Sequence, residues 1–434
     1  MNQRTVLKGL QISHTIPYRD PDALFALAGV DGKGKNAYLP VGENILSRHM
    51  LLLGAPGTGK SNMIAHMLRN IRANLTDADV MVVLDPMGEY YGAFYQLGDV
   101  VFGDDTRGCG DQGEAHWNLY AELCEDSRVI EDASALCNLL FEERIRDAAE
   151  PYYQSAARDL LMALIVYLCR RGGKDLQNNL ALRELIDGFD FGSMRQILEQ
   201  EPDLRALAAY LGNPESAGTL SVVAALQQAA RELFQGRFCQ EGTLGIRPLV
   251  RGKGGKVIFV CYNPSRGNML RSIYAALLDL CLQEALSRPE NEGNVYLLLD
   301  GIASFPRLPH LEDALLLGRS KGLKIIFSCL SVSQLYGCYG VAVAQSLLCA
   351  FGTTVAFRLH DRASRDYVKG LYGRHRVVET FTSSVQVRGT VEHVMDQYIV
   401  EDEDVTALQA LECIISTMHY PPFWFRQKPY GHQG

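Results

Sequence analysis

Residues 54–61 read Gly-Ala-Pro-Gly-Thr-Gly-Lys-Ser, which is a complete phosphate-binding loop. An apolar run at residues 49–53 precedes the loop, and a helical pattern at residues 62–68 follows it. This strand–loop–helix order is the context in which the motif binds a nucleoside triphosphate. The glycines allow consecutive backbone N–H groups to turn toward the phosphates, and the N-terminus of the next helix adds its dipole. The sequence therefore predicts that the chain binds ATP.

The expected nucleotide contacts come from this one continuous segment. Lys60 should reach the terminal phosphates, and the hydroxyl of Ser61 should bind Mg²⁺. The predicted cofactors are thus ATP and Mg²⁺. The predicted cofactor-binding residues are Gly54, Ala55, Pro56, Gly57, Thr58, Gly59, Lys60, Ser61 and Asn62.

A second apolar run supplies the expected partner for the metal. Residues 295–299 are apolar throughout and are followed by Asp300. An aspartate at the carboxyl end of a buried parallel strand lies where ligands bind in open α/β sheets. Phosphate-loop ATPases use such an aspartate to hold Mg²⁺. We therefore predict that Asp300 and Ser61 are the metal ligands.

The residue after Asp300 is Gly301. Many ATPases place a glutamate there, where it orients and deprotonates the attacking water. Glycine cannot act as a base, and the loss of general-base help costs about 10²–10⁴ in rate. Asp85 and Glu89 follow a neighbouring apolar run and are the alternative source of a base, although a turn of solvated acids is the favoured interpretation. Glu89 is therefore kept as a candidate catalytic residue.

Arg319 is the second candidate catalytic residue. It lies in a short basic segment, residues 318–322. An arginine supplied across a subunit interface can stabilise transition-state charge on the phosphates. A solvated basic turn is the alternative interpretation of this segment.

The composition limits the partners and the compartment. The formal net charge of −8 makes the chain a poor general binder of polyanions, so any contact with nucleic acid must be local. Three basic segments are candidates for such contacts, although each is also typical of a solvated loop: residues 170–174, 251–256 and 374–376. Eleven scattered cysteines favour reduced thiols in a cytoplasm. No apolar stretch approaches the roughly 20 residues of a membrane span, so we expect no transmembrane segment in this sequence.

The pattern along the chain predicts an α/β fold with an inserted helical domain. Short, continuous apolar runs separated by helical segments are typical of a mostly parallel sheet that is buried on both faces. Between residues 128 and 247, apolar residues recur every three to four positions, which predicts helices. Residues 377–386 and 391–400 are expected to form a two-stranded excursion. The predicted domains are residues 1–127, the first part of the nucleotide-binding domain with an N-terminal extension; residues 128–247, an all-helical domain; and residues 248–434, the second part of the nucleotide-binding domain.

The order of these motifs resembles that of the type IV coupling proteins. These are conjugation ATPases of the TraD/TraG type and are relatives of FtsK and HerA. The resemblance begins at about residue 37 and covers most of the chain from there on. The segments that carry it are residues 54–61, 85–89, 117–119, 152–161, 300–340 and 405–422, and residues 308–315, 318–323 and 331–337 are among the most specific.

The resemblance implies a RecA-like phosphate-loop NTPase domain with an all-helical domain, assembled as a homo-hexameric ring around DNA. It implies that the ring delivers a relaxase–DNA complex to a secretion channel, so DNA, relaxase and channel proteins are the expected partners. It also implies that Lys60 and Ser61 hold phosphate and Mg²⁺, that Asp300 is the Mg²⁺ aspartate, and that Arg319 acts as the finger. A cytoplasmic location follows, and recruitment to the inner face of the membrane is left open.

Three departures from the family pattern bear on this expectation. The catalytic glutamate of the family is replaced by Gly301, and the glutamine that senses the γ-phosphate is replaced by Leu330. The N-terminal membrane helices that are usual in the family are not found in this sequence. The first two departures affect hydrolysis and leave the binding loop intact, so we expect a coupling subunit whose hydrolysis is weak or lost. The alternatives are an active DNA-translocating ATPase of the HerA/FtsK type that uses another carboxylate or works with a nuclease partner, and a nucleotide-bound structural adaptor.

Overall fold

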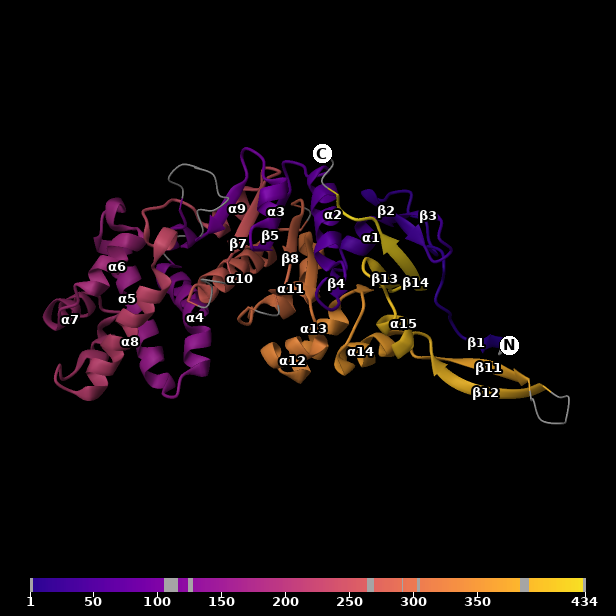
Figure 1. Cartoon of the computed structure of the whole chain (residues 1–434). Coiled ribbons are helices and arrows are strands. Elements are labelled where there is room, and N and C mark those ends of the chain that lie inside the picture. The colour runs from indigo at the N-terminus through magenta and orange to yellow at the C-terminus, as the bar shows by residue number, and fades with distance from the viewer. Residues whose placement is uncertain are drawn as a thin grey trace. The chain divides into compact units, whose positions relative to one another are not determined.

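The structure is a computed structural model, and contacts within the chain divide it into two compact units (Figure 1). The described residues are 3–104, 116–123, 128–263, 269–290, 292–302, 305–382 and 390–431. The first unit comprises Met1–Thr76, Tyr296–Ser304 and Leu315–Gly434, and the second comprises Asp77–Val295 and Phe305–Ala314.

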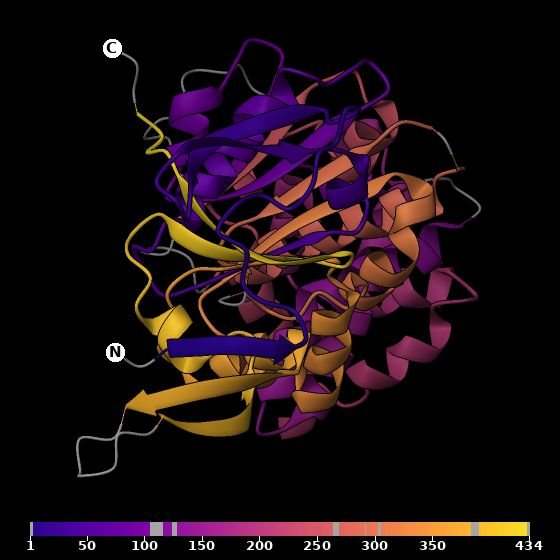
Figure 2. The ribbon, with the colours of Figure 1, turned by 90° about the vertical axis from the view of Figure 1, so that its right-hand side faces the viewer.

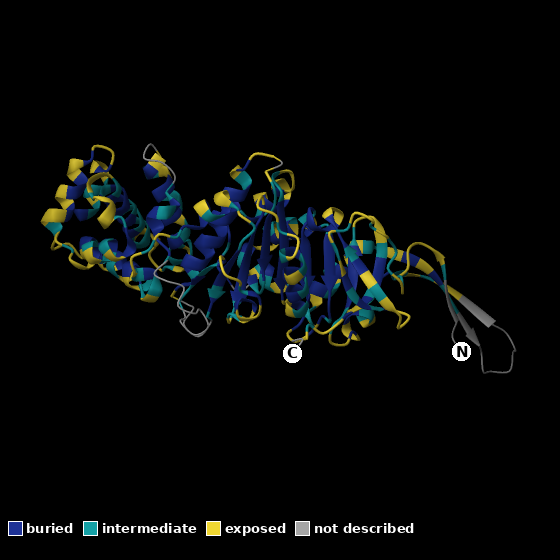
Figure 3. Cartoon of the chain, turned by 90° about the horizontal axis from the view of Figure 1, so that it is seen from above, coloured by how far each residue is buried: buried dark blue, intermediate teal, exposed yellow. Residues whose placement is uncertain are grey.

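A parallel core of buried strands forms the centre of the first unit. β4 (Met50–Leu53) pairs in parallel with β10 (Thr353–Ala356) on one side and with β9 (Leu323–Cys329) on the other. β8 (Val295–Leu299) lies next to β9. Every residue of these strands is buried, and Figure 3 shows the sheet largely in the colour of buried residues. Their continuous apolar sequences follow from this burial, because both faces of a central parallel strand are covered.

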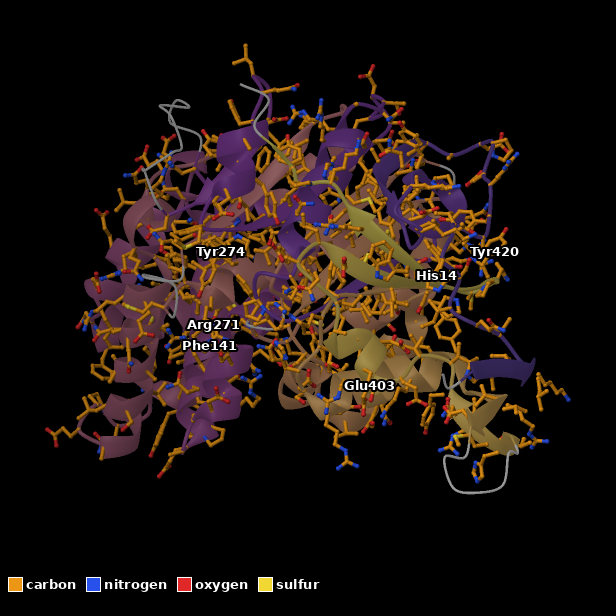
Figure 4. All side chains as sticks on the ribbon, turned by 45° about the vertical axis from the view of Figure 1, so that its right-hand side comes forward. His14, Phe141, Arg271, Tyr274, Glu403 and Tyr420 are labelled. Atoms are coloured by element: carbon orange, nitrogen blue, oxygen red, sulfur yellow. The ribbon has the colours of Figure 1, made fainter. Side chains whose placement is uncertain are left out.

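Four antiparallel strands extend this sheet beyond β10. In order they are β13 (Glu412–Thr417), β14 (Tyr420–Gln427), β2 (Phe25–Asp31) and β3 (Asn36–Val41). The segment before β2 also contacts β14, because Tyr18 stacks on Tyr420 with ring centroids 4.8 Å apart. Figure 4 labels His14 and Tyr420 on these two segments. Sequence analysis did not predict β2, β13 or β14.

A separate three-stranded sheet contains the predicted two-stranded excursion. β11 (Arg374–Thr382) and β12 (Thr390–Tyr398) pair antiparallel, which confirms that prediction, and the connection at residues 383–389 lies outside the described residues. β1 (Gln3–Lys8) adds a third strand beside β11, as Figure 2 shows, and was not predicted.

The helices of the first unit connect these strands. They are α1 (Glu43–Leu46), α2 (Lys60–Arg72), the short 3₁₀ helix η7 (Gly318–Lys321), α12 (Val332–Tyr339), α13 (Val341–Ala350), α14 (Arg362–Tyr372) and α15 (Asp402–Thr406). α11 (Leu311–Leu317) spans the division between the units. Two of these helices have side-chain N-caps, which are Ser331 for α12 and Asp361 for α14.

The second unit contains a small parallel sheet and a large helical part. Its strands are β5 (Val80–Pro86), β7 (Val257–Tyr262) and β6 (Val100–Gly103), with β7 in the middle. α3 (Glu89–Phe94) follows β5, and α10 (Arg271–Ser287) follows β7. Every named element between residues 128 and 252 in the described part of the chain is a helix, as the sequence predicted. The expected boundaries of a helical domain at residues 128 and 247 stay a prediction. The longer helices there are α4 (Val129–Asp147), α5 (Pro151–Arg171), α6 (Asn179–Asp187), α7 (Phe191–Gln200), α8 (Ala217–Leu233) and α9 (Ile246–Gly252).

A buried carboxylate joins several helices of the second unit. Glu122, in the 3₁₀ helix η1 (Leu119–Glu122), accepts hydrogen bonds from the backbone N–H groups of Ile246 (2.7 Å) and Arg247 (3.0 Å) and from Trp117 Nε1 (2.9 Å). The Arg247 guanidinium in turn donates to Asp132 in α4 at 3.3 Å, and to Gln283 in α10 at 2.7 Å. Burial raises the pKa of Glu122, and these donors oppose the shift. One charged network therefore connects η1, α4, α9 and α10.

A buried histidine at the start of β4 holds the parallel core of the first unit together. His49 adopts the left-handed conformation, with φ of 58°. Its Nδ1 accepts the backbone N–H of Ile325 at 3.1 Å, and its carbonyl accepts the N–H of Thr353 at 3.3 Å. Burial lowers the pKa of His49 to about 4. The ring is therefore neutral near pH 7 and serves as an acceptor between β4 and β9.

Replacing His49 with alanine should destabilise the chain by about 1–3 kcal/mol at pH 7, because the buried N–H of Ile325 loses its acceptor. Asparagine tolerates positive φ and carries an acceptor, so His49→Asn should cost less. Between pH 6.5 and 4 a proton binds the unfolded histidine in preference to the folded one, so the native chain loses stability as the pH falls. The alanine variant lacks this titration, and its cost should shrink by about 2 kcal/mol from pH 7 to pH 5. Urea denaturation at both pH values measures this, and an unchanged cost would contradict the role of the ring.

Candidate nucleotide site

The phosphate loop connects β4 to α2, as the sequence predicted. Gly57 and Gly59 have positive φ, 71° and 118°, which favours glycine at both positions. A β-carbon at Gly59 would also lie 2.6 Å from Nε2 of Gln427. Within the loop, the Thr58 hydroxyl donates to the carbonyl of Ala55 at 2.7 Å. The glycines and this hydrogen bond therefore contribute to the conformation of the loop.

Lys60 is the first residue of α2 and is buried against the loop. Its Nζ donates to the carbonyl oxygens of Gly54 (2.6 Å) and Ala55 (2.9 Å). Burial lowers the pKa of Lys60, and the negative charge of Asp300 opposes this shift. The ammonium group thus lies within the loop where the motif requires a cation for phosphate.

Ser61 and Asp300 meet, although they lie 239 positions apart in the sequence. The Ser61 hydroxyl donates to Oδ2 of Asp300 at 3.0 Å. Asp300 directly follows β8, so its carboxylate lies at the carboxyl edge of the parallel core. A hydroxyl and a carboxylate this close are the kind of oxygen ligands that Mg²⁺ takes beside substrate phosphates. The residues present therefore fit the predicted metal.

Gly301 and Leu330, the positions where we expect two catalytic side chains of the family to be replaced, lie at the same edge of the sheet. Gly301 follows Asp300 and has φ of 67°, and Leu330 directly follows β9. The end of β9 lies beside the loop, because the Gly54 N–H contacts the Cys329 carbonyl at 3.4 Å. Leu330 is partly exposed and, like Gly301, has no side-chain group that could orient or deprotonate water. A glutamate at position 301 would have to adopt a left-handed backbone conformation.

Arg319 is exposed on η7. Its side chain makes no hydrogen bond or ion pair within the described part of the chain, as a side chain offered to another subunit would require. Its catalytic role stays a prediction.

The alternative carboxylates differ from one another. Glu89 is exposed at the start of α3, in the second unit. Asp85 is fully buried, and its carboxylate accepts the N–H groups of Tyr90 (3.1 Å) and Tyr91 (2.7 Å). Burial raises the pKa of Asp85 to about 6, and these hydrogen bonds oppose the shift. The interpretation of this segment as a solvated turn is therefore wrong for Asp85, whose carboxylate accepts N–H groups from the first turn of α3.

The three basic segments proposed for nucleic acid each carry an ion pair. Arg170 contacts Asp203 at 2.8 Å, Arg251 contacts Glu284 at 2.9 Å and Arg376 contacts Asp396 at 3.0 Å. Part of their charge is therefore compensated within the chain. None of the three segments stands out as a DNA contact.

Sequence analysis missed two groups beside the loop. The carbonyl of Arg358 accepts the N–H of Ala55 at 3.0 Å. The side-chain Nε of Arg358 is buried without a hydrogen-bond partner among the described residues. The side-chain amide of Gln427 contacts both Gly59 and Asn62. No local pattern could have identified either residue, because Arg358, which follows β10, and Gln427, which ends β14, are both far from the loop in the sequence.

The family comparison covers most of the chain. Residues 34–424 match the family model of the type IV secretion-system coupling protein DNA-binding domain. The coupling protein TraD of Escherichia coli (strain K12) is 22% identical over 408 residues. That match covers 89% of this chain and 53% of TraD, so the chain spans about half the length of this curated relative.

Solved structures share the fold. The unbound monoclinic form of the bacterial conjugative coupling protein TrwBdeltaN70 has a TM-score of 0.78 and 21% identity, and the match covers 98% of this chain and 94% of that chain. The plasmid coupling protein TrwB in complex with ADP and Mg²⁺ has a TM-score of 0.77 and 23% identity, and the match covers 99% and 95%. The predicted RecA-like α/β fold with a helical part is confirmed. Within the described residues, no helix combines the length and apolarity needed to cross a membrane.

Proposed function

This chain belongs to the family of type IV secretion-system coupling proteins of the TraD/TraG type, and we propose that it is an ATP-binding coupling subunit whose hydrolysis is weak or lost. In this proposal it engages DNA as a hexameric ring and connects that DNA to a type IV secretion or conjugation machine. Relaxase and secretion-channel proteins are the proposed protein partners.

The contact between Ser61 and Asp300 carries the proposal of nucleotide binding. These two residues would hold Mg²⁺, and Lys60 would contact the terminal phosphates. When bound, Mg²⁺ neutralises charge on the β- and γ-phosphates. TrwB has been solved with the analogue ADPNP and with ADP and Mg²⁺, which supports the same class of ligand here.

The chemistry of positions 301 and 330 supports weak hydrolysis. Catalysis of phosphoryl transfer to water needs a group that orients the nucleophile, and neither Gly301 nor Leu330 can do so. Lys60, Ser61 and Asp300 are all present, so binding does not depend on the missing groups. Arg358, beside the loop, and Arg319, from a neighbouring subunit, are the proposed further cations toward the phosphates.

A ring explains how an acidic chain can hold DNA. The net charge of −8 disfavours a broad basic surface, but six copies of one short loop concentrate positive charge along a lumen. The DNA-binding domain description of the family model supports DNA as the partner.

Assembly on DNA tests this function. With double-stranded DNA and a non-hydrolysable ATP analogue, mass photometry should show species near six subunits, because nucleotide at each subunit interface would recruit Arg319. Arg319→Ala should shift the distribution toward monomers, whereas Arg195→Ala, an exposed arginine on α7, should not. A monomeric distribution under every condition would contradict the ring and leave Arg319 as a surface residue.

A further inference from the structure

The C-terminal hairpin β13–β14 holds two carbonyl groups of the phosphate loop. The backbone N–H of Leu411, just before β13, donates to the Thr58 carbonyl at 2.9 Å. The side-chain Nε2 of Gln427, the last residue of β14, donates to the Gly59 carbonyl at 2.7 Å. Leu411 and Gln427 are themselves joined, because the Gln427 N–H donates to the Leu411 carbonyl at 3.0 Å.

The residues that follow β14 extend this contact along α2. Asn62 Nδ2 donates to Oε1 of Gln427 at 2.8 Å and to the carbonyl of Lys428 at 3.0 Å, and the N–H of Tyr430 donates to Asn62 Oδ1. One turn further, the ring nitrogen Nε2 of His66 lies 3.0 Å from the Lys428 carbonyl. Residues 427–430, which we call the C-terminal strap, therefore lie on the first turns of α2.

These contacts help to set the direction of two loop amides, and the Gly59 carbonyl also accepts the N–H of Met63 in α2 at 3.0 Å. In a trans peptide the C=O and the following N–H point to opposite sides of the chain. When Thr58 and Gly59 have their carbonyls held by the hairpin, the N–H groups of Gly59 and Lys60 must point away from it. Backbone N–H groups of this part of a phosphate loop are the donors that cradle phosphate.

Gln427 is built into this position. Its side chain is almost fully buried, and its amide uses both ends, donating to Gly59 and accepting from Asn62. Gly59 leaves no room for a β-carbon on that side, since one would lie 2.6 Å from Gln427 Nε2 and 3.1 Å from Leu411 Cδ2. The loop and the hairpin are therefore fitted to each other.

We propose that Gln427 is a positioning residue that pre-organises the phosphate loop for the polyphosphate of its nucleotide. The inference rests on the proposed nucleotide binding. A loop whose amides are already oriented loses less conformational freedom on binding, so affinity increases without a new contact to the ligand. The increase in affinity should come from the polyphosphate part of the ligand and not from the base.

Calorimetry with Mg–ATP and with inorganic tripolyphosphate tests the proposal. Gln427→Met keeps the side-chain volume but loses both hydrogen bonds, and it should weaken both ligands by about tenfold. Gln427→Glu can still accept from Asn62 but cannot donate to Gly59 when ionised, so it should also weaken both ligands. The matched control is Gln409→Ala, an exposed glutamine whose Nε2 contacts the Ala407 carbonyl, and it should bind like the native chain.

The readouts separate the possible failures. The thermal midpoint of each variant without ligand is measured first, and a loss of affinity in a variant with a native midpoint supports positioning over general stability. Native affinity for tripolyphosphate in either folded Gln427 variant would overturn the proposal. Weakened ATP binding with unchanged tripolyphosphate binding would also overturn it, since the effect would then act on the base. If the native chain bound neither ligand, or if Lys60→Ala bound both normally, the proposed nucleotide binding itself would have failed.

Discussion

Mg–ATP should bind this chain in the micromolar range, whereas phosphate release with DNA present should stay far below the roughly 1–10³ s⁻¹ of ordinary enzymes. Binding should depend on Lys60, Ser61 and Asp300, which the structure brings together at the loop. Turnover depends on a group that activates water, and Gly301 and Leu330 supply none. Lys60→Ala should weaken Mg–ATP binding at least tenfold, about 1.4 kcal/mol.

Restoring the missing groups should raise the rate of phosphate release. A general base typically contributes about 10²–10⁴-fold in rate. Gly301→Glu should recover only part of this increase, because φ of 67° at this position strains a residue with a side chain. Gly301→Ala is the matched control, since it introduces the same strain without a carboxylate. Adding Leu330→Gln should raise the rate further, because both groups act on one water and their effects are coupled.

One result would contradict this account of turnover, and the Glu89→Gln variant would then locate the base. If the unmodified chain released several phosphates per second, and Lys60→Ala lost that rate, the assignment of the missing base to position 301 would be wrong. If Glu89→Gln abolished that rate, the base would come from the segment after β5, and the chain would be an active motor. If Glu89→Gln left it unchanged, another carboxylate would be responsible.

Glu122→Ala should destabilise the chain by about 3–5 kcal/mol, the typical cost of breaking a buried charged network. The alanine leaves the N–H groups of Ile246 and Arg247 and the indole N–H of Trp117 without their shared carboxylate acceptor. The Arg247 guanidinium keeps the backbone carbonyl of residue 122 but loses the nearby negative charge. Glu122→Gln keeps one acceptor oxygen and should cost less. Urea denaturation in a Trp424→Phe background measures this, because Trp117 is then the one remaining tryptophan of the two in the sequence and lies within the network.

Glu131→Ala is the control for this prediction. Glu131 is an exposed glutamate in the first turn of α4, and its loss should change the unfolding free energy by no more than about 0.5 kcal/mol. Equal costs for Glu122→Ala and Glu131→Ala would show that the network does not stabilise the second unit.

Much of the fold could be predicted because its signals are local. The strands of the parallel core are continuous apolar runs, and the helices between residues 128 and 252 repeat every three to four positions. β13 and β14 could not be found in this way. β14 begins Tyr420-Pro421-Pro422, and prolines argue against a strand unless its partners leave those N–H groups unpaired.

In the candidate site too, features with a local sequence signal could be predicted and those that depend on tertiary packing could not. The interpretation of Asp85 as solvated was wrong, because burial depends on what packs over a residue. A single polar residue after an apolar run does not indicate whether that residue is buried. Asp300 was identified correctly as the partner of Ser61, since the motif order and the strand end together specify which edge of the sheet it occupies.

The sequence by itself determined the phosphate loop, the pairing of Ser61 with Asp300, and the prediction that Gly301 and Leu330 replace catalytic side chains. Each of these depends on which residue stands at one position of a short segment. Only the tertiary structure decided that the C-terminal hairpin orients the loop, because Gln427 and Gly59 are 368 residues apart. A hydrogen bond between such distant segments leaves no periodic pattern in the chain, since it requires only that two strands of one sheet end at the same place.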